Sequence, residues 1–429
     1  MHSVRQISPQ LILKVSDREL GFLGYLVIDQ SLFGRAIGGV RMRDGLTLDE
    51  VAKLAREMTL KFAFLNIPVG GAKAAVIWKP FSSDEERGRI FTAFGKNLGP
   101  LLTKNICSLG EDMGTYSQDI YHIKRGAGID IERPTSNNGI SAYYTAITVF
   151  VAAEQLVNSQ GFKLSGSRVA IEGLGKVGTC VAKLFSDAGA DIVAVSTIKG
   201  GIYNPEGIDI VRLIELKKEA GDEAVNSYPD AVTIPKESLL ALDVDILVPC
   251  AGPYTITKDN VWQLKAKIVV PGGNIAATDE AESVMFERGI RYMPSFVSSS
   301  GGILAYALFA HGFGRTNAEK IMKKGFGKKI SSLIKISHKE CISLGQKTRE
   351  IAERNLKGSE QRMRHKQNEK LMELLSLWQK GGLTKLIETV LWRSYKLSFK
   401  FRASFLLRLF ATRYMEDKLS NEVTPWADL

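Results

Sequence analysis

The segment Ser167–Gly178, SRVAIEGLGKVG, decides the fold, because it joins an apolar strand to a glycine turn and the start of a helix. Thr179–Ala188 continues that helix and Ile192–Val195 reads as the next strand, which completes a βαβ unit. The spacing Gly-x-Gly-x-x-Gly lets backbone N–H groups approach a pyrophosphate and lets the helix pack closely on the strand. The pattern predicts dinucleotide binding; a glycine turn without a ligand is the alternative. The turn residues expected to contact the dinucleotide are Gly173, Gly175, Lys176, Val177 and Gly178.

Further strands extend this unit into a parallel sheet. We expect them at Asp245–Pro249 and Ile268–Val270, and the second runs into Gly272-Gly273-Asn274. Asn274 would then lie at the carboxyl end of a strand, where open α/β sheets bind ligands.

Two lysines occupy apolar surroundings in the first third of the chain. A helical pattern starts at Thr47, and Lys61 falls on or beside its apolar face, although a lysine reaching out from the edge of that face is the alternative. Lys73 follows a Gly-Gly turn at the head of an apolar strand. Both side chains are therefore candidates for a dry functional site.

Composition bounds the class of protein. With 429 residues, 45% hydrophobic and 24% charged, the chain is expected to be globular. Its length suits two domains and leaves some residues over. Its longest apolar stretches are too short to cross a bilayer and its start lacks an apolar signal region, so we expect a cytoplasmic location. Four cysteines lie far apart without a Cys-x-x-Cys pair, and no metal site is expected.

The net charge of +11 belongs to the C-terminal quarter. Residues 316–429 contain 24 Lys or Arg against 12 Asp or Glu, whereas residues 1–315 contain 33 against 34. A nearly neutral body thus precedes a basic, helix-permissive tail. Basic amphipathic segments suit a subunit or partner interface, or an anionic membrane surface. Nucleic acid ranks last among the partners that we expect.

Four short segments of the first third of the chain form a specific set of motifs. They are Gly38-Gly39-Val40-Arg41-Met42, Met58-Thr59-Leu60-Lys61, Pro68-Val69-Gly70-Gly71-Ala72-Lys73 and Glu111-Asp112-Met113-Gly114-Thr115. With these motifs, the chain resembles the glutamate/leucine/phenylalanine/valine dehydrogenase family over residues 20–315. The resemblance implies reversible oxidative deamination of an L-amino acid with NAD or NADP, and a homo-oligomer.

The resemblance and the chemistry together assign catalytic roles. Lys61 is the candidate cation for the substrate α-carboxylate. Lys73 is the candidate base that takes a proton from water, provided that burial and the Lys61 cation depress its pKa. Asp112 would bind the substrate ammonium group and shuttle a proton, with a solvated loop carboxylate as the alternative.

Coenzyme residues outside the glycine turn follow from the same resemblance. Ser141 replaces a threonine near the nicotinamide carboxamide, and Asn274 matches an asparagine near the ribose. The second strand of the βαβ unit ends in Ser196, Thr197 and Lys199 without the acid that usually binds a ribose 2′-hydroxyl. Thr197 is a candidate contact, and the choice between NAD and NADP stays open.

Departures from the family pattern suggest the substrate. Glutamate enzymes have a lysine and a serine for the side-chain carboxylate where this chain has Ile37, just before Gly38 and Gly39, and Tyr306. Burying a carboxylate there without its cation would be costly. We therefore expect an apolar amino acid, as in the leucine and phenylalanine branch. Gly110 leaves room for a bulky side chain, and Ser299 stands where relatives use an asparagine to hold the α-amino group.

We therefore expect an α/β protein with a substrate domain and a Rossmann-type domain. The substrate domain is expected at 1–134, completed by helices at 311–360, the NAD(P)-binding domain at 135–310, and a basic helical extension at 361–429. Glutamate dehydrogenase activity, or a non-catalytic nucleotide-binding regulatory or scaffold protein of the same fold, is the alternative.

Overall fold

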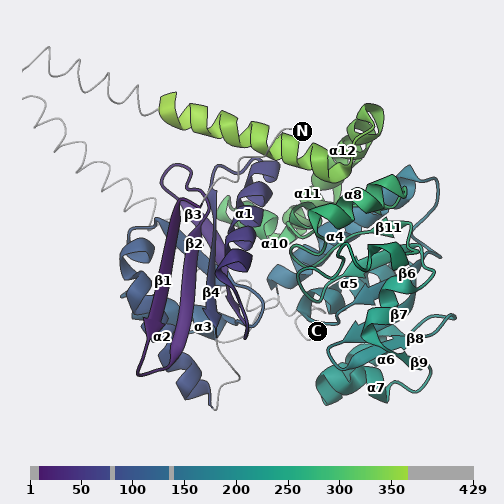
Figure 1. Cartoon of the computed structure of the whole chain (residues 1–429), viewed down its shortest axis with the longest axis horizontal. Helices are drawn as coiled ribbons and strands as arrows, with labels where there is room; N and C mark the ends of the chain where they lie inside the picture. The colour runs from purple at the N-terminus through teal and green to yellow at the C-terminus, as the bar shows by residue number, and fades with distance from the viewer. Residues whose placement is uncertain (1–8, 78–82, 135–139, 366–429) are drawn as a thin grey trace, which may run out of the picture.

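The computed structural model describes residues 9–77, 83–134 and 140–365, which form two α/β domains that lie side by side (Figure 1). Each domain has its own sheet. The expected fold class, a first α/β domain beside a Rossmann-like domain, is confirmed. The proposed boundaries at 134 and 310 stay a prediction, and the tail lies outside the described residues from 366 on.

The first domain is built on a five-stranded sheet of order β1-β2-β4-β3-β5. Strand β2 is antiparallel to β1 and β4, whereas β3 is parallel to both β4 and β5. Because β3, β4 and β5 are parallel, their carboxyl ends lie at the same edge of the sheet. The strands are β1 Leu11–Asp17, β2 Phe22–Ile28, β3 Ala36–Met42, β4 Gly70–Ile77 and β5 Cys107–Glu111.

Helix α1, Leu48–Leu65, covers this sheet and faces the second domain (Figure 1). Its N-cap is Thr47, whose hydroxyl accepts a bond from the Glu50 N–H, and it ends at Asn66 in the left-handed conformation. Its buried face contains Lys61, as the sequence indicated. Helices α2 Asp84–Thr103 and α3 Ser117–Gly126 pack against each other in the same domain.

The second domain has a seven-stranded sheet of order β12-β11-β10-β6-β7-β8-β9. Strands β12 to β7 are parallel, and β8 and β9 add an antiparallel edge. Helix α4 Ile140–Ser159 is buried in the main core, where it contacts α5 Lys176–Asp187. The strands are β6 Arg168–Glu172, β7 Asp191–Thr197, β8 Gly200–Tyr203, β9 Val232–Ile234, β10 Ile246–Pro249, β11 Ile268–Val269 and β12 Arg291–Tyr292.

Short helices complete the second domain. Helices α10 and α12 lie against α4, and a π-helical turn precedes α12. The set is α6 Ile210–Ala220, α7 Ala224–Ser227, α8 Asp279–Glu287, α9 Ser295–Ser298, α10 Gly301–Ala310, α11 Arg315–Ile321, the π-turn Met322–Phe326 and α12 Gly327–Glu340, with 3-10 turns at Gly221–Glu223, Lys236–Ala241 and Val261–Gln263.

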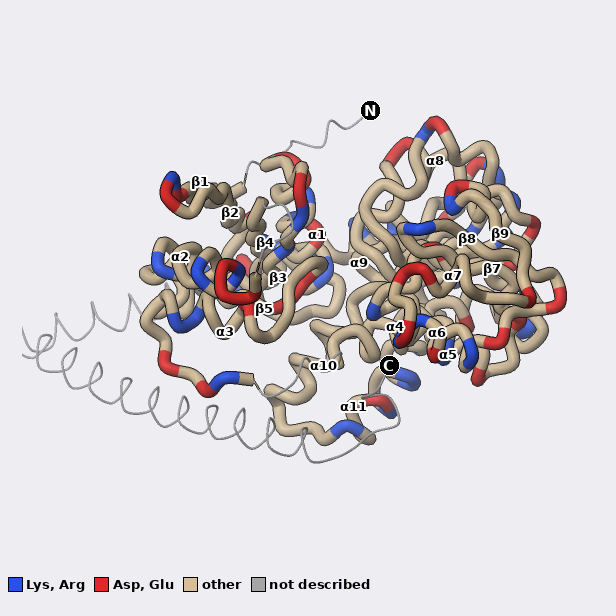
Figure 2. Tube along the Cα trace, turned by 90° about the horizontal axis from the view of Figure 1, so that it is seen from below, with Lys and Arg blue, Asp and Glu red and all other residues tan. Residues whose placement is uncertain are grey.

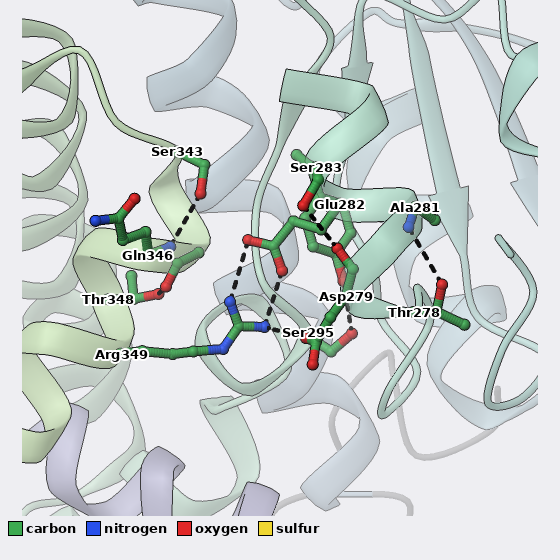
Figure 3. A network of polar contacts seen from close by, with 12 residues as sticks. Thr278, Asp279, Ala281, Glu282, Ser283, Ser295, Ser343, Gln346, Thr348 and Arg349 are labelled. Carbon is green, nitrogen blue, oxygen red and sulfur yellow. Dashed lines mark hydrogen bonds and ion pairs between the residues drawn. The ribbon is translucent and has the colours of Figure 1, made fainter. Parts of the chain in front are cut away.

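A last helix, residues 344–365, crosses back to the first domain (Figure 1). The Asn355 side-chain amide donates to the Ala63 carbonyl of α1 over 3.0 Å. At the start of this helix, Arg349 donates to Glu282 and Asp279 of α8, each over 2.9 Å (Figure 3). The helix therefore ties α1 of the first domain to α8 of the second.

Within the described part of the chain, α4 alone has the length and apolar character of a membrane span. Its candidate window is 67% buried inside the protein, which is typical of the core helix of a soluble protein. The cytoplasmic location stays a prediction.

Candidate active site

A buried cluster of charge lies across three neighbouring parallel strands of the first domain. Lys73 Nζ on β4 is 2.9 Å from Asp112 Oδ2, directly after β5. Arg41 on β3 donates from Nε to the same oxygen over 2.7 Å. The strand order β4-β3-β5 explains the meeting, because Val40 pairs with both Ala74 and Glu111. Lys73 and Asp112 were each predicted to be catalytic, whereas Arg41 was only part of a quoted motif.

Burial sets the protonation of this cluster. Burial lowers the pKa of Lys73 from its ordinary value, partly opposed by Asp112, and the Arg41 cation lowers it further. Burial alone would raise the pKa of Asp112, but Lys73 and Arg41 outweigh it and hold that pKa well below the ordinary value. The expected depression of the Lys73 pKa is thus present, although Arg41 rather than Lys61 is the main cation involved. These cations therefore favour the anionic form of Asp112 at neutral pH.

Lys61 reaches from the first domain to the second. Its Nζ donates over 3.1 Å to Asn274 Oδ1, to the Ser299 carbonyl and to Ser299 Oγ. Lys61 comes from α1, Asn274 follows β11 and Ser299 ends α9, so three distant segments meet at one ammonium group. Burial lowers the pKa of Lys61 to about 8, against the nearby Glu57 anion, which raises it.

Glu57 is a second residue without a role in the sequence analysis. It lies one turn before Lys61 on α1, and its Oε2 is buried without a hydrogen-bond partner among the described residues. Burial raises the pKa of Glu57 to about 7, whereas Lys61 and Arg349 act to lower it. An acid four residues before a buried lysine was the available sequence signal.

The glycine turn before α5 fits a pyrophosphate. Gly173 has φ 94°, and a Cβ on Gly178 would lie 1.9 Å from the Gly173 carbonyl, so both positions require glycine. A Cβ on Gly175 would meet no atom within 4 Å, and Gly175 caps α5 without a side-chain bond. The first N–H groups of α5 have no acceptor within the helix, and such groups at a helix start suit a phosphate.

Two turn side chains extend this site. Lys176 Nζ lies 4.0 Å from Glu111 Oε2 and 4.3 Å from the centre of the Tyr116 ring, both in the first domain. Val177 is half-buried against the main core. Lys176 thus makes a second polar contact between the domains.

The other predicted coenzyme residues lie on α4 and β7. Ser141 is in the first turn of α4, and its Oγ would be 2.5 Å from a Cβ on Gly302. Thr197 ends β7, where its hydroxyl donates to the Asp222 carbonyl and accepts from the Lys199 N–H. Thr197 Oγ1 is therefore engaged within the protein.

The predicted substrate residues differ in their settings. Ile37 is half-buried on β3 between Gly71 and Ser108, next to the buried Gly38 and Gly39. A Cβ on Gly110 would meet no atom within 4 Å, which agrees with the expected room beside it. Tyr306 is 62% exposed on α10, a helix that lies between the domains in both views (Figure 1, Figure 2).

Comparison with known proteins identifies the family. Residues 139–362 match the family model described as Glutamate/Leucine/Phenylalanine/Valine dehydrogenase, and residues 9–127 match the model of its dimerisation domain. The chain belongs to this family. It is accordingly an amino-acid dehydrogenase, an oxidoreductase that acts on CH–NH₂ donors with NAD or NADP.

Three curated relatives that the chain resembles are named glutamate dehydrogenases. That of Thermotoga maritima is 38% identical over 297 residues, 66% of this chain and 70% of the relative. A catabolic NAD-specific enzyme of Bacillus subtilis is 34% identical, covering 66% and 69%. An NADP-specific enzyme of Halobacterium salinarum is 33% identical, covering 62% and 66%. The expected leucine and phenylalanine branch is therefore not confirmed.

A solved structure supports the same assignment. The hetero-hexameric glutamate dehydrogenase of Thermus thermophilus, in a leucine-bound form, superposes with a TM-score of 0.72 at 26% identity. The superposition covers 82% of this chain and 89% of that one.

Proposed function

We propose that the chain catalyses the reversible oxidative deamination of an L-amino acid whose side chain is apolar. The reaction converts the amino acid, water and oxidised coenzyme into a 2-oxo acid, ammonium, reduced coenzyme and a proton. The buried contact of Lys73 with Asp112, beside Lys61, is the observation that carries the proposal.

Each residue of this cluster suits one step. Lys61 would donate to the substrate α-carboxylate, and the anionic Asp112 would hold the substrate ammonium group. The residues of the glycine turn would hold the coenzyme, which would supply the acceptor for the hydride of the α-carbon. Asp112 would take one proton from that ammonium group before the hydride leaves. Lys73, in its neutral form, would then take a proton from the water that attacks the iminium carbon, and Asp112 would return its proton to the departing amine. The depressed pKa of Lys73 makes its neutral form accessible.

The surroundings of Ile37 favour an apolar side chain. A substrate carboxylate at this position would lose its solvation without gaining a cation from residue 37. Nearby, Gly110 leaves open space. Helix α10 is apolar along most of its length, yet only Gly301 and Ala305 are fully buried in it. These features support leucine, valine or phenylalanine as substrates.

Glutamate is the second candidate, because the curated relatives are named glutamate dehydrogenases. A direct comparison decides between the two. We would follow formation of reduced coenzyme by the purified full chain with leucine, valine, phenylalanine and glutamate, each with NAD and with NADP. Turnover of glutamate at least equal to that of the apolar amino acids would refute the apolar substrate and leave the reaction class intact.

The reaction itself is tested by Lys73→Ala. We expect kcat to fall by about 10²–10⁴, the usual contribution of a positioned acid or base. Lys104→Ala, an exposed lysine of the same domain, should leave kcat unchanged. Full activity in Lys73→Ala would refute the role of Lys73 as the base. Silence of the wild type with every substrate, despite coenzyme binding, would favour the non-catalytic alternative.

A homo-oligomer is also part of the proposal. The first domain matches a family model described as a dimerisation domain, and the Thermus relative is a hexamer by its description. Light scattering of the purified chain would give the subunit number, and a monomer at working concentration would contradict the proposal.

A further inference from the structure

A basic hollow lies on the second domain, formed by α4, the π-turn and α12. It has a volume of about 430 Å³. Four of the eight residues that line it are lysines and none is acidic. The lining residues are Gln155, Lys323, Lys324, Gly327, Lys328, Ser331, Ser332 and Lys335.

The lysines come from two consecutive elements. Lys323 and Lys324 lie on the π-turn, whereas Lys328 and Lys335 lie two turns apart on one side of α12, with the two serines between them. A Cβ on Gly327 would lie 3.4 Å from Val151 and 3.9 Å from Gln155, so α12 packs directly against α4 at this point. The hollow is thus shaped by helix packing and not only by extended side chains.

On the helical segment that carries these lysines, acids are few, and both contact other residues. Residues 315–340 contain eight Lys or Arg and only two Glu. Glu340 pairs with Lys347 over 2.5 Å, and Glu319 bonds Tyr143. Glu154, at the rim, lies 3.4 Å from the Gln155 amide. Within the described part of the chain, none of the four lysines has an ion pair or a side-chain hydrogen bond.

Uncompensated like charges close together on helices repel one another, so this arrangement suits an anionic partner. Lysine ammonium groups bind phosphate as point charges, and serine hydroxyls donate to phosphate oxygens. Lys328 and Lys335 are about 10 Å apart along the axis of α12, which exceeds the length of one phosphate ion.

We propose that this hollow is a binding site for an oligophosphate, either free or as the phosphate chain of a nucleotide. The site is separate from the glycine turn at Gly173–Gly178, and it does not depend on the identity of the amino-acid substrate.

The test is calorimetric titration of the full chain with sodium tripolyphosphate at physiological ionic strength, with reduced coenzyme saturating the glycine turn. The variant Lys324→Gln/Lys328→Gln/Lys335→Gln removes three charges while glutamine keeps the helix propensity. The control Lys218→Gln/Lys258→Gln/Lys265→Gln removes three exposed charges elsewhere in the same domain. Both variants should retain the wild-type dehydrogenase rate, which confirms that they fold.

We expect the hollow variant to bind tripolyphosphate roughly tenfold more weakly or worse, and the control to match the wild type within about twofold. Equal losses in both variants would show a general effect of net charge and overturn the proposal, as would unchanged binding in the hollow variant or no binding by the wild type. The single variant Lys328→Gln should show an intermediate loss. A parallel titration with adenosine triphosphate separates the sources: tighter binding than tripolyphosphate, weakened by the hollow variant, indicates a nucleotide, and equal binding indicates the phosphate chain alone.

Discussion

Lys61 and Lys73 are similarly buried but have different electrostatic partners. Lys73 is held by Asp112 over 2.9 Å, whereas Lys61 has only neutral acceptors within hydrogen-bond distance. The charge of Lys61 is instead supported by Glu57, which raises its pKa from one turn away. The protonation of the proposed carboxylate-binding group therefore depends on a residue that need not touch the substrate.

This arrangement predicts a pH effect. Binding of the substrate carboxylate needs Lys61 charged, so kcat/KM for the amino acid should fall as pH rises through about 8. Glu57→Gln removes the anion that raises the pKa of Lys61, and the falling limb should move to lower pH. Initial rates measured across pH in both proteins test this.

The control is Asp49→Asn, an exposed acid in the first turn of α1 that pairs with Lys53. It should leave the falling limb in place. If the fall of kcat/KM stays at the same pH in Glu57→Gln, the proposed effect of Glu57 on the pKa of Lys61 is refuted. If the fall moves equally in both variants, a general effect of net charge explains it.

Among the strands, a glycine of the first sheet decides how closely two neighbours can pack. On β3, a Cβ at Gly38 would lie 1.9 Å from the Ala72 carbonyl of β4. We expect Gly38→Ala to lower the free energy of unfolding by about 1–3 kcal/mol, because the strands must separate to admit the methyl group. Urea unfolding measures this change.

Gly110→Ala on the neighbouring β5 is the matched comparison. Its Cβ would meet no atom within 4 Å, so the free energy of unfolding should change by less than about 0.5 kcal/mol. The added methyl should instead raise KM for phenylalanine, if the open space receives the substrate side chain. A large loss of stability in Gly110→Ala would contradict the strand geometry.

The sequence was sufficient to predict the elements whose local residue pattern agrees with their place in the folded protein. The βαβ unit was predicted within a few residues, because its strands are continuous apolar runs and its turn needs glycine. The meeting of Lys73 and Asp112 came from motif resemblance alone. The pairing of Arg41 with Asp112 depends on the strand order β4-β3-β5, and the contact of Lys61 with Ser299 joins residues 238 positions apart. Neither contact has a local signal.

In the whole molecule, the helix at 344–365 links the two domains. Arg349 is the link to α8, and Glu282, its partner there, is only 8% exposed (Figure 3). We expect Arg349→Ala to lower the free energy of unfolding by about 1–3 kcal/mol, because Glu282 would keep a buried charge without its donor. The value should lie near the low end, since Arg349 itself is 38% exposed.

Arg354→Ala, an exposed arginine of the same helix, should change the free energy of unfolding by less than about 0.5 kcal/mol. Thermal or urea unfolding of both variants makes the comparison. Equal effects of the two substitutions would show that the link to α8 contributes nothing specific.

An ammonium group has three protons to donate, and Lys61 already uses three acceptors, all on the other domain. Under the proposed role, a substrate carboxylate competes for the same protons. The substrate can therefore bind Lys61 only when these contacts between the domains are released. The measured affinity for substrate is lowered accordingly, because only the molecules with a free Lys61 ammonium group can bind it.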